Sequence, residues 1–164
     1  MYPKEILELA DQIISSFASR KLKIVTAESC TGGLIAGALT EIPGASAVVE
    51  RGFVSYSNNA KIEVLGVEPD LLQVAGSVSA DVAEEMAQGA LEFSGADVAI
   101  SSTGIAGPDG GTPLKPVGLV YFGIATRQGV KLHYRCQFAG DRTSIRLQAV
   151  KEAFRLLQSI ADDN

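Results

Sequence analysis

The chain has 164 residues, of which 46% are hydrophobic and 20% charged, and its formal net charge at pH 7 is −5. This composition excludes a disordered or strongly charged chain, and the length suits a single compact domain covering residues 1–164. The negative charge argues against a nucleic-acid partner, because nucleic-acid surfaces concentrate Lys and Arg.

The first half of the chain alternates predicted helices with predicted strands. Residues 3–19 carry apolar side chains at helical spacing, with Pro3 in a first-turn position, and predict an amphipathic helix. Residues 22–27 form a short run with β-branched side chains at Ile24, Val25 and Thr26, as in a strand buried on both faces, and residues 31–39 predict a helix rich in small residues. Residues 47–56 predict a second strand, which a short helix carrying residues 61–65 follows.

The second half contains, in order, a loop, a helix, a strand, a Gly- and Pro-rich loop, a hairpin and a last helix that Asp141 caps. The segments before that last helix are residues 66–76, 79–93, 96–103, 104–113, and 117–126 paired with 130–138. Helices that alternate with strands and then give way to a hairpin predict a three-layer α/β/α sandwich with a mixed, largely parallel sheet.

Two irregular segments, residues 28–33 and 103–113, each follow a predicted strand. Ligands of open α/β sheets bind outside the carboxyl ends of parallel strands, so we expect these segments to face one another. Ser29 presents a hydroxyl at the turn before a helix, and the backbone N–H groups after it are candidate oxyanion donors. Position alone favours a plainer role for Ser29 as a helix N-cap.

A serine nucleophile needs a base, and the sequence offers two candidates. His133 is the only histidine and lies in a predicted hairpin strand, where an edge-strand imidazole without a catalytic role is the simpler interpretation. Lys61 can act if burial favours its neutral amine, and Tyr56 is placed to relay a proton or orient that amine. A solvent-facing position is the ordinary expectation for a single Lys.

Cys30 is a rival nucleophile, because a helix N-terminus lowers the pKa of a thiol, although small cysteines in this setting are often packing residues. Two Cys and one His do not make an ordinary zinc site, and isolated carboxylates such as Glu28, Asp109 and Asp141 do not make a metal site, so we expect no metal and no disulfide framework. No apolar run approaches the roughly 20 residues of a membrane span and no secretory signal is evident, which predicts a cytoplasmic protein without a membrane partner.

The loop of residues 103–111 lacks the Lys-Ser/Thr ending of a Walker P-loop and does not match the dinucleotide fingerprint. Its exposed backbone N–H groups suit an anion or a small polar ligand, with a tight structural turn as an equal alternative. Arg142, in the first turn of the last helix, is able to clamp a phosphate bidentately, although spacing alone describes an exposed Arg.

The chain resembles the CinA C-terminal domain family, which includes bacterial nicotinamide-mononucleotide deamidases. The resemblance covers almost the whole chain and rests on motifs in the same order: residues 26–33 (TAESCTGG), 52–58 with Lys61, 102–111 (STGIAGPDGG), 117–121 and 140–142.

This resemblance implies hydrolysis of the carboxamide of nicotinamide mononucleotide to nicotinate mononucleotide and ammonia in pyridine-nucleotide salvage, without a cofactor. It implies Ser29 as the nucleophile, with Lys61 and Tyr56 as activating partners. We place the substrate against Cys30, Thr31, Gly32, Gly33, Thr103, Gly104 and Arg142, with Arg142 suited to the phosphate.

Two other functions stay open at this point. The first is a domain that binds a nucleotide without turnover or serves as an interaction module in competence or DNA-damage responses. The second is an enzyme that hydrolyses another small carboxamide. The apolar helices and the family resemblance favour a homodimer.

Overall fold

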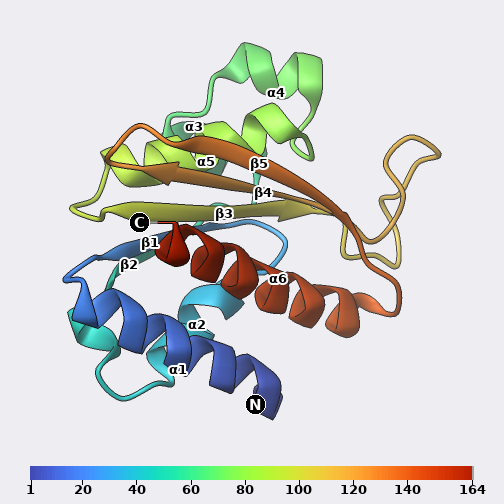
Figure 1. The fold of residues 1–164 in the computed structure, drawn as a ribbon. Coiled ribbons are helices and arrows are strands. Elements are labelled where there is room, and N and C mark those ends of the chain that lie inside the picture. The colour runs from blue at the N-terminus through green and yellow to red at the C-terminus, as the bar shows by residue number, and fades with distance from the viewer. Residues whose placement is uncertain (164) are drawn as a thin grey trace.

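The computed structural model describes residues 1–163, which form a five-stranded mixed sheet between two layers of helices (Figure 1). The strand order is β2-β1-β3-β4-β5, with β2, β1 and β3 parallel and β4 and β5 antiparallel to their neighbours. The elements are α1 (Lys4–Ser19), β1 (Ile24–Glu28), α2 (Leu34–Thr40), the 3₁₀ helix η1 (Ala45–Ala47), β2 (Val49–Val54), α3 (Asn58–Leu65), α4 (Pro69–Ala75), α5 (Ala80–Glu92), β3 (Val98–Gly104), β4 (Leu119–Thr126), β5 (Lys131–Gln137) and α6 (Arg142–Asp162). The predicted α/β sandwich is confirmed.

Three elements differ from the sequence prediction. The segment predicted as a loop over residues 66–76 contains α4, whose only fully buried residue is Leu72, so it leaves little periodic signal. The second strand begins at Val49, after η1, and the second helix begins at Leu34, because residues 29–33 form an irregular turn.

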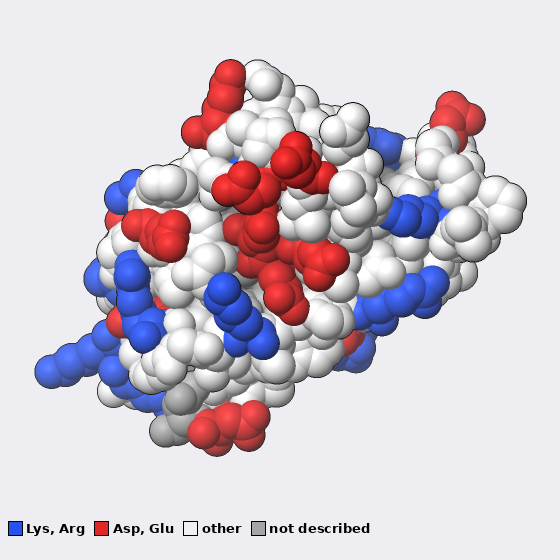
Figure 2. Space-filling model, turned by 90° about the horizontal axis from the view of Figure 1, so that it is seen from above, with Lys and Arg blue, Asp and Glu red and all other residues white. Residues whose placement is uncertain are grey.

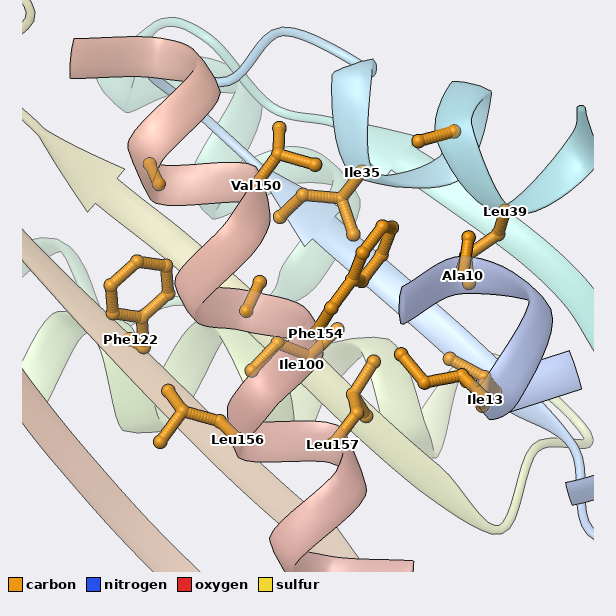
Figure 3. Close-up of a cluster of buried hydrophobic side chains, with 14 of the residues drawn as sticks. Ala10, Ile13, Ile35, Leu39, Ile100, Phe122, Val150, Phe154, Leu156 and Leu157 are labelled. Carbon is orange, nitrogen blue, oxygen red and sulfur yellow. The ribbon is translucent and has the colours of Figure 1, made fainter. Parts of the chain in front are cut away.

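The larger part of the core lies between the sheet and the layer of α1, α2 and α6 (Figure 3). Phe154 of α6 and Ile100 of β3 meet Ile35 and Leu39 of α2 and Ile13 of α1 there, all of them essentially inaccessible to solvent. This packing fixes α2, and with it the turn that follows β1, against the sheet.

The other face of the sheet packs closely against α5, and α5 packs against α3. Ser101 of β3 donates a hydrogen bond to the carbonyl of Ala83 in α5 at 2.5 Å. A Cβ atom added at Gly89 of α5 would lie 1.8 Å from the carbonyl oxygen of Leu65, the last residue of α3. Only a glycine allows this approach, which lets the end of α3 pack directly against α5.

The loop between β3 and β4 projects beyond the carboxyl ends of the parallel strands, at the right of Figure 1.

Across residues 1–163, no helix combines the length and the apolar character that crossing a membrane requires.

Candidate active site

A pocket of about 450 Å³ opens at the carboxyl ends of β1 and β3, between the turn after β1 and the loop after β3. It brings together seven of the residues that the sequence singled out: Ser29, Cys30, Tyr56, Lys61, Thr103, Gly104 and Arg142. The two irregular segments therefore lie on one pocket, as the position of parallel strand ends predicts.

Ser29 is held in the pocket lining by main-chain hydrogen bonds from the end of β1 to β3 and to the residue after β2. Its backbone N–H donates to Ser102 O at 2.9 Å, and the N–H of Ser55 donates to the carbonyl of the preceding residue, Glu28, at 2.9 Å. The hydroxyl of Ser29 caps no helix, since α2 begins five residues later with Gly33 as its N-cap in the left-handed conformation. Ser29 Oγ instead lies 2.9 Å from Nζ of Lys61.

Glu28 takes the capping role that the sequence analysis considered for Ser29. Its fully buried carboxylate accepts hydrogen bonds from the N–H groups of Gly33, Ile35 and Ala36 at 3.1, 3.0 and 2.9 Å. A carboxylate at a helix N-terminus satisfies donors that the helix itself leaves free. Glu28 thus fixes the start of α2 relative to the neighbouring residue, Ser29.

Lys61 is only 1% exposed, although α3 is a short helix near the surface. Its Nζ contacts Ser29 Oγ and donates to the carbonyl oxygens of Ser55 and Tyr56 at 3.0 and 3.2 Å. Burial holds the pKa of this amine below its usual value of 10.5. In the neutral amine, the two N–H bonds serve the two carbonyls, so the lone pair faces the hydroxyl of Ser29.

Tyr56 contacts the amine through its backbone rather than its side chain. The carbonyl lies 3.2 Å from Lys61 Nζ, whereas the phenol hydroxyl accepts a hydrogen bond from Arg142 Nη2 at 3.0 Å and the residue is 60% exposed. Arg142 also donates from Nη1 to Gly107 O at 2.8 Å. The Tyr56 hydroxyl therefore does not lie between Ser29 and Lys61, and the amine reaches the serine directly.

Cys30 is 6% exposed and lies among apolar side chains. Burial, together with the charge of Glu28, raises the pKa of its thiol to about 12. The thiol is therefore protonated at neutral pH, which does not suit a nucleophilic role for Cys30.

Three of the predicted substrate-binding residues, Thr31, Gly32 and Gly33, do not line the pocket. Thr31 is fully buried and its hydroxyl hydrogen bonds with that of Ser102 at 2.7 Å. Gly32 and Gly33 have positive φ angles of 58° and 95°, which suit glycine and turn the chain into α2. The irregular turn lies where the sequence predicts it, but Thr31, Gly32 and Gly33 determine its backbone shape and do not face the pocket.

Arg146 of α6 supports the same turn and was not foreseen. Its guanidinium donates from Nε to Cys30 O at 3.0 Å and from Nη2 to Thr31 O at 3.1 Å. The helical spacing of Arg142 and Arg146 places both on one face of α6, which is the only signal that the sequence offered.

Thr103 and Gly104 end β3 at the pocket wall. The hydroxyl of Thr103 donates to Ser77 O at 2.6 Å and so ties the start of the α5 segment to the sheet. A Cβ atom at Gly104 would lie 2.7 Å from Leu119 O, so the close pairing with β4 requires glycine. Further lining residues that the sequence did not single out are Gly76, Ser77, Val78, Thr112 and Lys115.

His133 lies on β5 outside the pocket lining, where its Nδ1 lies 2.6 Å from Glu84 Oε1. It is therefore not the base for Ser29. Within residues 1–163, no group of three or more His, Cys, Asp or Glu side chains is arranged to hold a metal ion.

Comparison with known proteins identifies the family. The model of the CinA C-terminal domain matches residues 6–161. The chain belongs to the CinA C-terminal domain family.

Relatives of this CinA C-terminal domain fall into two length classes. The nicotinamide-nucleotide amidohydrolase PncC of Enterobacter agglomerans is 52% identical over 149 residues, which are 91% of each chain. The protein of the same name from Escherichia coli K12 is 46% identical over 157 residues, covering 96% of this chain and 95% of that one. A putative competence-damage inducible protein of Caldicellulosiruptor saccharolyticus is 50% identical over 150 residues, but this chain spans only 36% of its length.

A solved structure has nearly the same fold. The crystal structure of a competence/damage inducible protein from Agrobacterium tumefaciens superimposes with a TM-score of 0.95 at 51% identity, covering 97% of each chain. The arrangement of strands and helices described above is therefore that of the CinA C-terminal domain.

Proposed function

We propose that this CinA C-terminal domain hydrolyses the carboxamide of nicotinamide mononucleotide to nicotinate mononucleotide and ammonia, in pyridine-nucleotide salvage. The observation that carries the proposal is the contact of 2.9 Å between the buried amine of Lys61 and the hydroxyl of Ser29 at the pocket. Relatives of matching length that bear the name nicotinamide-nucleotide amidohydrolase support the choice of substrate.

The first half of the mechanism forms an acyl-enzyme. Neutral Lys61 takes the proton of Ser29 as Ser29 Oγ attacks the amide carbon, and backbone N–H groups of the turn after Ser29 stabilise the oxyanion. Lys61 then passes that proton to the nitrogen, and the C–N bond breaks to release ammonia.

The second half returns the enzyme to its starting state. Lys61 takes a proton from water, the resulting hydroxide attacks the acyl carbon, and the ester bond to Ser29 breaks as Ser29 regains a proton from Lys61. The carbonyls of Ser55 and Tyr56 keep the amine aimed at the serine through both halves. Arg142, at the pocket rim, is suited to the substrate phosphate.

The test follows ammonia release from nicotinamide mononucleotide by the purified protein. Ser29→Ala is expected to lower kcat by at least about 10³-fold, as loss of a serine nucleophile does elsewhere. Cys30→Ala is the matched control, since it changes the adjacent residue and removes the rival nucleophile; it should keep activity within a few fold. Ser29→Ala at the wild-type rate would exclude Ser29 as nucleophile, and tight binding without ammonia release would favour a binding module instead.

A further inference from the structure

Lys115 comes from the projecting loop between β3 and β4 and lines the same pocket as Ser29. It is half-buried, and its Nζ donates to the carbonyl of Ala75, the last residue of α4, at 2.7 Å. The mechanism above gives this lysine no role.

The space beside Gly76 and the turn at Thr112 both favour the observed direction of the Lys115 side chain. A Cβ atom at Gly76 would lie 3.1 Å from Lys115 Nζ, and Gly76 has a φ of 77°, so a side chain there would crowd the ammonium. On the other side, the Lys115 N–H donates to the hydroxyl of Thr112 at 3.0 Å, and the Thr112 N–H donates to Lys115 O at 2.8 Å. This two-way contact forms a tight turn that directs the lysine across to Ala75.

The ammonium keeps donors for a ligand. Within residues 1–163, the Lys115 ammonium makes one hydrogen bond, to Ala75 O, and no carboxylate lies within ion-pair distance of it. Lys61, by contrast, has all three positions around its nitrogen occupied by Ser29, Ser55 and Tyr56.

The pocket is more basic than the protein around it. Two cations, Lys115 and Arg142, line it against one carboxylate, that of Asp109, in a chain of net charge −5, and the third basic side chain of the lining, Lys61, is the neutral amine of the mechanism. Figure 2 shows acidic side chains gathered in the middle of the α3 to α5 face, with Lys and Arg side chains on both sides of them, including the end where the loop projects. An anionic group is therefore favoured at this end of the molecule.

We infer that Lys115 binds the phosphate of the mononucleotide and thereby sets the preference of the site for a phosphorylated substrate over the corresponding nucleoside. The inference rests on the proposed function, which names the substrate. Lys115 acts as a specificity residue: its two remaining N–H groups donate to phosphate oxygens, while the reacting carboxamide lies at Ser29. The contact with Ala75 holds the ammonium in place before the ligand arrives.

The experiment compares kcat/KM for nicotinamide mononucleotide and for nicotinamide riboside, which lacks the phosphate. Lys115→Gln is expected to lower kcat/KM for the mononucleotide by about 10- to 100-fold, the range of a hydrogen-bonded ionic contact, and that for the riboside by less than about 2-fold. Leu114→Ala is the matched control, because Leu114 is the preceding residue of the same loop and is 89% exposed. It should leave both values unchanged.

A purely structural role for Lys115, as a tie between the loop and the end of α4, predicts a different result. Both substrates would then lose activity by the same factor, and that outcome overturns the inference while leaving the proposed function in place. Equal activity of Lys115→Gln and wild type on both substrates overturns it as well.

Binding separates the two proposals if wild-type protein releases no ammonia. In that case the proposed function fails, and calorimetric titration with nicotinate mononucleotide decides the role of Lys115 separately. An affinity that falls at least 10-fold in Lys115→Gln but not in Leu114→Ala supports the anion site. Unchanged or absent binding overturns it.

Discussion

Replacing Glu28 by Gln tests whether the buried carboxylate organises the turn that carries Ser29. The amide keeps the shape of the side chain but has one oxygen, so it cannot accept from Gly33, Ile35 and Ala36 in the present arrangement. Retaining the two bonds at the Oε2 position leaves the Ala36 N–H facing an NH₂ group. A buried hydrogen bond to a charged group contributes about 1.5–3 kcal/mol, and a negative charge at a helix N-terminus up to about 2 kcal/mol.

After allowance for the solvation that a buried carboxylate gives up, we expect Glu28→Gln to lower the free energy of unfolding by about 2–4 kcal/mol. Urea unfolding followed by circular dichroism measures this change. Glu8→Gln is the control, because Glu8 forms only an exposed pair with Lys4, and it should cost less than about 0.5 kcal/mol. A loss below about 1 kcal/mol for Glu28→Gln would show that the N–H groups of α2 find other acceptors and would refute this account.

Three further predictions concern the base, the buried thiol and the helix contact that places the base. Because burial lowers the pKa of Lys61, kcat/KM should rise with pH through that pKa and level off above it. The unfolding free energy should also rise with pH between that pKa and 10.5, because in this range only the unfolded chain keeps the proton on Lys61. Lys61→Met should remove this dependence of the unfolding free energy on pH. With a thiol pKa of about 12, Cys30 should react with iodoacetamide at pH 8 about 10²–10³-fold more slowly in folded than in urea-unfolded protein, measured in a variant without the other cysteine; equal rates would contradict its burial. The Cβ of Gly89→Ala would lie 1.8 Å from backbone, so this variant should lower the free energy of unfolding, measured by thermal denaturation, by about 3 kcal/mol or more. Gly95→Ala is the control and should change this free energy little, because nothing lies within 4 Å of its Cβ position. A larger loss for Gly95→Ala than for Gly89→Ala would be incompatible with the packing of α3 on α5.

The fold was predictable from sequence where the signal is local. Apolar periodicity in α1 and α6 and β-branched runs in β1 and β3 are properties of short segments, and the structure confirms them. The helix α4 was missed because it is seven residues long and buries little. The start of α2 was misplaced because its cap, Glu28, comes from a strand five residues before the first N–H that it binds, outside the usual local cap pattern.

The site shows the same division. The sequence pointed to Ser29 and Lys61 as candidates, but only tertiary packing of α3 puts the lysine at 1% exposure beside the serine. The direction of the Tyr56 hydroxyl toward Arg142 and the reach of Lys115 to Ala75 depend on loops that meet only in the folded chain. The homodimer and the cytoplasmic location stay predictions.

The amine of Lys61 is aimed by main-chain oxygens, those of Ser55 and Tyr56, and every residue type carries such an oxygen. The side chain of Tyr56 can therefore be exchanged while the groups that orient the base remain in place. Since Tyr56 also lines the pocket and its hydroxyl accepts from Arg142, an exchange at this position alters the surroundings of the substrate, including the group suited to its phosphate, and leaves the oxygens that aim the amine in place. A library randomised at Tyr56 changes the side chain that faces the substrate and keeps Ser29, Lys61 and the two carbonyl oxygens that orient the amine.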